Sequence, residues 1–201
     1  MKKFIYLISP NKIEPNFYKN LDSVLSSGKI KFFQLRLKNY SLIKLIKISQ
    51  KIKVLTKKHK VNLIINDFPI VAKRINADGC HLGQSDETIR NTKKLLKKNK
   101  IVGITCHGSK KLVSDAIKNK VDYIAIGSFF KSKLKPKAKK AKIIDLKKIR
   151  DKTKLPIVAI GGVNQKNYKK LLNSGANYIA ISSFIWNNPI LNPSDAIKRI
   201  K

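Results

Sequence analysis

The chain has 201 residues, with 45 Lys and Arg against 11 Asp and Glu, which gives a formal net charge of +34. This length accommodates one hydrophobic core, and we expect a single domain over residues 1–201. No apolar stretch approaches the roughly 18 residues of a membrane span, so the composition argues against a membrane protein and predicts a cytoplasmic one.

The excess of lysine first suggests binding to nucleic acid or to an anionic membrane surface, because dense positive charge attracts polyanions. Only five of the cations are arginines, however, and the lysines are spread over nearly every predicted helix rather than gathered in one patch. We therefore interpret most of the charge as solvated helix surface. The sequence predicts neither a nucleic-acid partner nor a membrane partner, and a polyanion-binding protein without catalysis is the distant alternative.

Short β-branched runs alternate with longer segments of helical period, which is the pattern of repeated βα units around a parallel sheet. The predicted strands are residues 4–9, 31–35, 61–66, 79–82, 101–105, 123–127, 157–160 and 178–182. The predicted helices are residues 17–25, 42–58, 70–75, 86–96, 111–119, 144–152, 165–173 and 193–200. This α/β pattern predicts a single (β/α)8 TIM barrel, and a doubly wound open sheet is the alternative.

Capping residues support several helix boundaries. Ser41, Ser85 and Asn164 stand at predicted helix starts, where their side chains can accept a hydrogen bond from the first turn, and Gly175 follows a helix end. The long connection over residues 129–143 contains a lysine-rich run, and we predict that it forms a mobile lid.

Polar residues collect where the predicted strands end, which is the edge of a barrel at which active sites form. They are Gln34, Arg36 and Lys38; Asn66 and Asp67; His81, Gln84, Ser85 and Asp86; Thr105 and His107; Gly161 and Gly162; and Ser182 and Ser183. Any one of them could be an ordinary turn or helix cap. As a group they predict one functional site.

The ends of the last two predicted strands favour a phosphate site. Gly161 and Gly162 allow the backbone to approach a ligand closely, and Ser182 and Ser183 precede a stretch that can form a short helix with free amides. The alternative is that the two glycines form only a tight turn.

Asp67 and Asp86 are two of the scarce acids, and the ends of neighbouring barrel strands would bring them together. Magnesium prefers oxygen ligands and commonly takes one or two carboxylates plus substrate phosphates and water. We therefore predict a Mg²⁺ site at these two residues, beside Arg36, Lys38 and a lid lysine that could neutralise a diphosphate. The alternatives are a turn residue for Asp67 and an acid in the first turn of a helix for Asp86.

Several segments of the chain closely resemble the thiamine phosphate synthase family. They are residues 34–38 (Gln-Leu-Arg-Leu-Lys), 66–67 (Asn-Asp), 77–86 (Ala-Asp-Gly-Cys-His-Leu-Gly-Gln-Ser-Asp), 127–130 and 159–163, within a match from Tyr6 to about Ile185. The resemblance implies a (β/α)8 barrel and a transferase. It would join hydroxymethylpyrimidine diphosphate to a thiazole phosphate, with or without a carboxylate, and release diphosphate with the help of Mg²⁺.

The resemblance also implies roles for individual residues, with Asp67 and Asp86 holding Mg²⁺. Arg36, Lys38 and Lys135 would stabilise the departing diphosphate. The pyrimidine diphosphate would be bound by Gln34, Arg36, Lys38, Asn66, Thr105 and Lys135, and the thiazole phosphate by Ser132, Gly162, Ser182 and Ser183. The implied reaction is dissociative, in that the aminopyrimidine supports a carbocation that the thiazole nitrogen captures without a general base.

The lid departs from the family pattern. The family usually has Thr-x-Thr-Lys, whereas this chain has Ser132-Lys133-Leu134-Lys135, so an apolar side chain replaces one hydroxyl contact to the thiazole. Ser128 stands where proline is common, and Thr105 replaces a serine. The related thiazole tautomerases place a histidine at the position of Ser128, so the resemblance favours the synthase and leaves the isomerase as the alternative. The sequence leaves open whether the chain forms a homo-oligomer.

Overall fold

The structure, a computed structural model, describes residues 3–131 and 140–201. The strands are β1 Ile5–Ile8, β2 Ile30–Leu35, β3 Asn62–Asn66, β4 Gly79–Leu82, β5 Ile101–His107, β6 Tyr123–Gly127, β7 Ile157–Ile160 and β8 Tyr178–Ile181. The helices are α1 Phe17–Leu25, α2 Leu42–Lys58, α3 Pro69–Arg74, α4 Ile89–Leu96, α5 Lys110–Lys118, α6 Ile143–Arg150, α7 Tyr168–Leu172, α8 Ser183–Trp186 and α9 Pro193–Lys198. Over these two ranges, no helix has both the length and the apolar character needed to span a bilayer.

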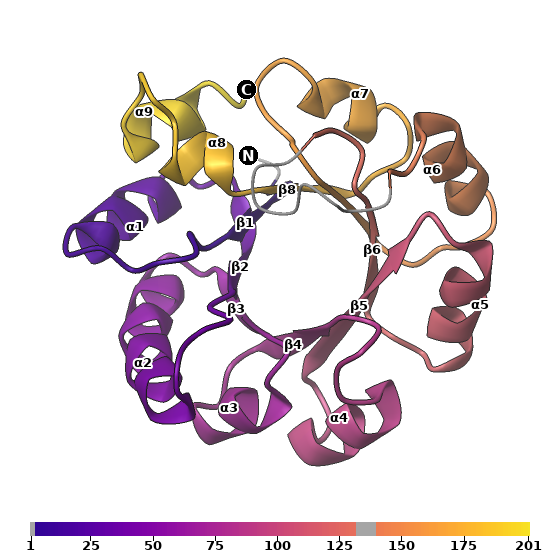
Figure 1. Ribbon diagram of the computed structural model, residues 1–201, viewed down its shortest axis with the longest axis horizontal. Helices are drawn as coiled ribbons and strands as arrows, with labels where there is room; N and C mark the ends of the chain where they lie inside the picture. Colours follow the sequence, from indigo (N-terminus) through magenta and orange to yellow (C-terminus); the bar gives the residue numbers. More distant parts are fainter. Residues whose placement is uncertain (1–2, 132–139) are drawn as a thin grey trace.

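The eight strands are parallel and close into a barrel in chain order, because β1 pairs with both β2 and β8. The helices form a ring outside this sheet (Figure 1). The closed sheet confirms the predicted TIM barrel and rules out the doubly wound alternative. Every strand consequently ends at the same rim of the barrel.

Two apolar layers lie on opposite sides of the sheet, because successive residues of a strand point to opposite faces. In β1, Ile5 and Leu7 belong to the outer layer between the sheet and the helices, whereas Tyr6 belongs to the inner layer. The buried members of the inner layer are Tyr6, Phe32, Ile64, Tyr123, Ala125, Val158 and Ala180. This inner cluster fills the barrel below the strand ends and leaves the rim free for polar side chains.

Tyr123 reaches across the barrel interior over Gly103. A Cβ atom at Gly103 would lie 2.0 Å from the Tyr123 Cζ atom, so the absence of a side chain makes room for the ring. The Tyr123 ring centroid lies 5.7 Å from that of Tyr6 and 5.9 Å from that of Phe32. These packed aromatic rings form a floor beneath the carboxyl ends of the strands.

Two helices begin later than predicted. The N-cap of α4 is Thr88, whose hydroxyl accepts a hydrogen bond of 3.2 Å from the Asn91 amide, and Ser85 lies in the preceding loop. The N-cap of α7 is likewise Asn167, with Asn164 in the loop before it. Ser41 does cap α2, as predicted. Asp86 therefore precedes α4 and is not an acid of its first turn, which removes the helix-dipole explanation for this carboxylate.

Mutation can show whether Thr88 or Ser85 caps the start of α4. We expect Thr88→Ala to lower the free energy of unfolding by about 1 kcal/mol, because a helix amide loses its hydrogen-bond acceptor. Ser85→Ala is the matched control and should leave the stability unchanged, since this exposed side chain caps no helix. Urea unfolding followed by circular dichroism measures both variants. Equal losses in the two would contradict the assigned cap.

Candidate active site

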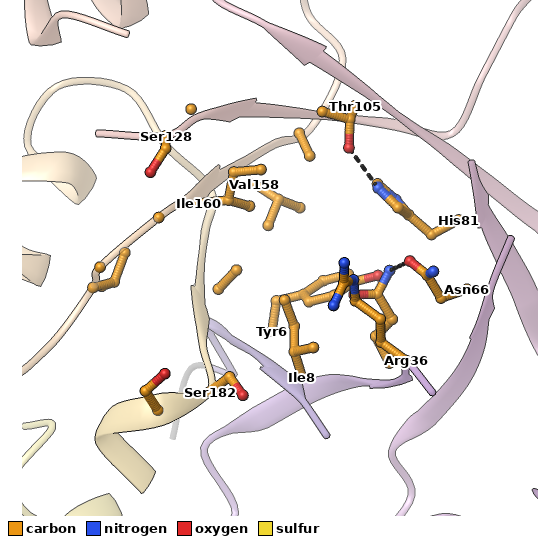
Figure 2. Close-up of a pocket in the computed structure, with 18 of the residues that line it drawn as sticks. Tyr6, Ile8, Arg36, Asn66, His81, Thr105, Ser128, Val158, Ile160 and Ser182 are labelled. Carbon is orange, nitrogen blue, oxygen red and sulfur yellow. Dashed lines mark hydrogen bonds between the residues drawn. The ribbon is translucent and has the colours of Figure 1, made fainter. Parts of the chain in front are cut away.

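A cavity of about 690 Å³ opens at the carboxyl ends of the strands, a size typical of small-molecule sites. It is lined by each predicted site residue that the structure describes, namely Gln34, Arg36, Lys38, Asn66, Asp67, Asp86, Thr105, Gly162, Ser182 and Ser183. Ser132 and Lys135 lie outside the described residues. Figure 2 shows Arg36, Asn66, His81 and Thr105 on one side of the cavity, facing Ser128, Val158 and Ile160 on the other.

The polar wall begins with two amide side chains that fix each other's orientation. Gln34 Nε2 donates a hydrogen bond of 3.0 Å to Asn66 Oδ1, and both side chains belong to buried residues. This contact leaves the Gln34 carbonyl oxygen as an acceptor and the Asn66 amide as a donor. The pair suits the edge of a heterocycle that presents a donor beside an acceptor.

Two cations follow β2 at the rim. Arg36 is held through its backbone, whose amide donates to Ser9 Oγ at 2.9 Å, and its side chain extends into the cavity (Figure 2). Burial lowers the pKa of Arg36, although an arginine stays charged at any physiological pH. The ion pairs found in the described part of the chain do not include Arg36. Its guanidinium is therefore available for a bound anion.

Asp67 and Asp86 meet at the ends of β3 and β4, as predicted. Asp67 has a left-handed backbone with φ of 63°, a conformation that Asp and Asn tolerate better than most residues. Asp86 Oδ2 accepts a hydrogen bond of 2.6 Å from the Gly83 amide, and a Cβ at Gly83 would lie 2.8 Å from the same oxygen. The two carboxyl groups are hydrogen-bonded to each other, and Lys38 Nζ lies 3.9 Å from Asp67 Oδ2.

The pKa values of the two carboxyl groups move in opposite directions. Burial, followed by the contact with Asp86, raises the pKa of Asp67 to about 6. Partial burial acts to raise the pKa of Asp86 as well, but its hydrogen bonds with Asp67 and the Gly83 amide outweigh this and lower it. A divalent cation would offset the negative charge of the two carboxylates, because it prefers carboxylate oxygens. No cluster of three or more potential metal ligands occurs among residues 3–131 and 140–201, so other ligands would come from substrate and water.

A chain of hydrogen bonds runs from the polar wall into the aromatic floor. Thr105 Oγ1 lies 2.9 Å from His81 Nε2, and His81 Nδ1 lies 2.8 Å from the Tyr123 hydroxyl. The Tyr123 hydroxyl in turn lies 2.7 Å from that of Tyr6. Tyr6 and Tyr123 were not predicted from the sequence as site residues. Each is a tyrosine at an inward-facing position of a strand that otherwise consists mainly of aliphatic residues, and this pattern could have marked both as site residues.

The glycine pair after β7 has a packing role as well as a place in the cavity wall. Both residues have a left-handed φ, 99° at Gly161 and 63° at Gly162. A Cβ at Gly161 would lie 2.6 Å from Ser128 Cα, and one at Gly162 would lie 2.4 Å from the Lys131 carbonyl oxygen. The missing side chains therefore allow the segment after β6 to pass close to the end of β7. Tight packing of the chain itself requires glycine here, independently of any ligand.

The predicted short helix after β8 is present as α8. Ser182 is its N-cap residue, and the Ser182 hydroxyl donates a hydrogen bond of 3.1 Å to the Ser9 carbonyl oxygen. Ser182 and Ser183 both line the cavity. Figure 2 shows Ser182 across the cavity from His81 and Thr105. The predicted phosphate site after β8 and the polar wall therefore lie in one cavity, facing each other.

Comparisons with known proteins agree with this geometry. Residues 5–185 match a family model described as "Thiamine monophosphate synthase". A thiamine-phosphate synthase from Pelagibacter ubique is 52% identical over 201 residues, covering 100% of this chain and 97% of that protein. One from Clostridium acetobutylicum is 33% identical over 90% of this chain and 86% of its own length. The solved structure of a thiamine phosphate pyrophosphorylase from Pyrococcus furiosus superposes with a TM-score of 0.87 at 27% identity, covering 98% of this chain and 93% of that one.

The raised pKa of Asp67 predicts a pH-dependent stability in metal-free protein. The folded state binds this proton more tightly than the unfolded chain does, so stability falls as pH rises through about 6. Asp67→Asn keeps a neutral hydrogen-bond donor to Asp86 and suits the left-handed backbone. We expect it to raise the free energy of unfolding by roughly 1 kcal/mol at pH 7.5, since one pKa unit corresponds to about 1.4 kcal/mol before solvent screening.

The same comparison at low pH provides the control. At pH 4.5 the Asp67 carboxyl is protonated in the folded wild type, so the stabilisation by Asp67→Asn should be much smaller than at pH 7.5. Urea unfolding in the presence of a chelator at both pH values measures the difference. A stability gain of equal size at both pH values would contradict the assignment.

Proposed function

Since the chain belongs to the thiamine monophosphate synthase family and is a thiamine-phosphate-forming transferase, we propose that its cavity binds both substrates and that Asp67 and Asp86 hold Mg²⁺ there. The reaction joins hydroxymethylpyrimidine diphosphate to a thiazole phosphate and releases diphosphate. The observation that carries the site assignment is the meeting of two hydrogen-bonded carboxyl groups with Arg36 and Lys38 at one rim of the cavity.

Arg36 and Lys38 bind the diphosphate of the pyrimidine substrate in this proposal. Arg36 provides a planar group for bidentate contact with phosphate oxygens, and Lys38 provides a point charge on the same side of the cavity. The half-buried guanidinium has no carboxylate partner among the ion pairs of the described chain, which supports an anionic ligand at this position. Lys135, which lies outside the described residues, is proposed as a further cation for the departing diphosphate.

The carboxylate oxygens of Asp67 and Asp86 are ligands of the kind that Mg²⁺ prefers. The raised pKa of Asp67 reflects burial and contact with Asp86, and a cation between the two carboxylates would relieve that contact. When bound, Mg²⁺ would neutralise negative charge on the diphosphate as the bond to carbon breaks. The Gly83 amide holds Asp86 in place through the 2.6 Å hydrogen bond, so the carboxylate does not need to reorganise.

The pyrimidine ring is proposed to lie against the polar wall formed by Gln34, Asn66 and Thr105. The fixed amide pair offers an acceptor beside a donor, which matches an amino group next to a ring nitrogen. As diphosphate leaves, positive charge develops on the ring and its exocyclic carbon. The thiazole nitrogen then forms the new bond by using its own lone pair, so no side chain has to remove a proton for that step.

Gly162, Ser182 and Ser183 are proposed to bind the phosphate of the thiazole substrate, and Ser132 to contact the thiazole. The first three line the same cavity, and Figure 2 shows Ser182 across it from Asn66. This separation places the phosphate of one substrate away from the diphosphate of the other. It also leaves the middle of the cavity for the two rings to meet.

The purified protein should form thiamine phosphate and diphosphate from the two substrates in the presence of Mg²⁺. Chromatography of the reaction mixture detects both products, and heat-treated protein is the control. A chain that forms no thiamine phosphate but interconverts thiazole tautomers would instead be an isomerase of the same barrel family.

Replacement of either acid should weaken the dependence on magnesium. We expect Asp67→Asn and Asp86→Asn each to lower kcat/KM by roughly 100-fold or more and to raise the Mg²⁺ concentration needed for half-maximal rate. Asp151→Asn changes an exposed carboxylate after α6 and should leave both quantities unchanged. An unaltered magnesium titration in the two site variants would remove the metal assignment.

A further inference from the structure

The hydrogen-bonded chain from Tyr6 to Thr105 contains four groups that can each donate only one proton to it. Burial raises the pKa of Tyr6 and of Tyr123 well above the usual value of 10, so both phenols remain protonated. A neutral imidazole carries one N–H, and the threonine hydroxyl carries one O–H. While His81 is neutral, the chain can therefore point in one of two directions.

In the first direction, Tyr6 donates to Tyr123, Tyr123 donates to His81 Nδ1, and His81 Nε2–H donates to Thr105 Oγ1. The Thr105 proton is then free to point into the cavity. In the reverse direction, Thr105 donates to His81 Nε2, His81 Nδ1–H donates to Tyr123, and Tyr123 donates to Tyr6. The Tyr6 proton is then left at the inner end of the chain.

The surroundings of the two ends favour the first direction. Tyr6 is 2% exposed and its ring packs with Phe32 in the apolar layer inside the barrel, so a proton left there would be buried without an acceptor in the chain. Thr105 is less buried and lines the cavity, where a ligand can accept its proton. The His81 ring also lies nearly parallel to that of Tyr123, with 17° between the ring planes, which keeps Nδ1 beside the phenol.

We propose that Tyr123 and His81 are positioning residues that hold the Thr105 hydroxyl as a hydrogen-bond donor to a ring nitrogen of the pyrimidine substrate, with Tyr6 setting the direction of the chain. This inference rests on the proposed function for the identity of the ligand. The direction of the chain is a property of the protein alone. Tyr6 acts by occupying the acceptor site of the Tyr123 oxygen, which leaves the Tyr123 proton for His81.

The proposal gives the polar wall a fixed pattern of donors and acceptors. Thr105 and the Asn66 amide donate, and the Gln34 carbonyl oxygen accepts. A ring in which C–H replaces the nitrogen facing Thr105 loses an acceptor and leaves the hydroxyl proton without a partner. The site consequently selects heterocycles by their nitrogen positions as well as by shape.

The first experiment determines the tautomer of His81 in protein without substrate. The chain has three histidines, so ¹⁵N NMR spectra can be assigned with the aid of His59→Gln and His107→Gln variants. We expect the Nε2–H tautomer in the wild type, because Tyr123 donates to Nδ1. Tyr6→Phe should shift the signals toward the Nδ1–H tautomer, because the Tyr123 oxygen is then free to accept from His81. An Nδ1–H tautomer in the wild type, or an unchanged tautomer in Tyr6→Phe, would overturn the proposal.

The second experiment measures binding of the pyrimidine diphosphate and of two analogues, each with one ring nitrogen replaced by C–H. Calorimetry is performed with Mg²⁺ and without the thiazole substrate. One analogue should bind about three- to tenfold more weakly than the parent to the wild type, as expected for one neutral hydrogen bond. This difference should disappear in Thr105→Val and shrink in Tyr123→Phe, while Thr105→Ser should retain it.

Tyr178→Phe is the matched control, because Tyr178 packs on Phe32 but takes no part in the hydrogen-bonded chain. It should retain the wild-type discrimination between parent and analogue. Equal discrimination in wild type and Thr105→Val would overturn the proposed contact. Failure of the wild type to form thiamine phosphate would count against the proposed function instead, and the NMR result would still stand.

Discussion

Closure of the parallel sheet is the constraint on which the site depends. Because β1 pairs with β8 as well as β2, the carboxyl ends of all eight strands lie on one rim. Arg36, Asp67 and Asp86 follow different strands and meet only through this closure. Successive side chains of each strand then point alternately to the core beneath the helices and to the barrel interior. The cavity is therefore a product of topology, and the individual side chains decide what it binds.

The acids at the rim are held in an arrangement that the fold alone does not favour. Burial disfavours the charged form of Asp67, and the contact with Asp86 adds repulsion, which is why the pKa of Asp67 rises to about 6. Placing two carboxyl groups side by side lowers the stability of the fold, which is typical of functional sites. The positive net charge of +34 does not by itself neutralise them, because most lysines lie on solvated helices rather than in the cavity. A bound cation would act where the surface lysines cannot.

The parts that depend on local pattern could be predicted from the sequence, and those that depend on contacts across the barrel could not. The bounds of β4, β6 and β7 were predicted correctly. The start of α4 was placed too early, since Ser85 and Thr88 are both plausible caps and only the structure shows which hydroxyl reaches a helix amide.

The contacts of Tyr123 with Gly103, His81 and Tyr6 join four different strands and have no local signature in the sequence. The packing role of Gly161 and Gly162 after β7 also could not be predicted from the sequence. Their missing side chains make room for the segment that follows β6, a neighbour only in the folded barrel.

The aromatic floor has an electrostatic consequence for the reaction. Among the described residues of the cavity wall, the lysine and arginine side chains are Arg36, Lys38 and Lys131, and all three follow strand ends at the rim. Tyr6 and Tyr123 below them are neutral phenols. The three cations outnumber Asp67 and Asp86 at the same rim, so the mouth of the cavity carries a net positive fixed charge that favours an anion there. Positive charge on an organic ring deeper in the cavity faces the two neutral phenols instead.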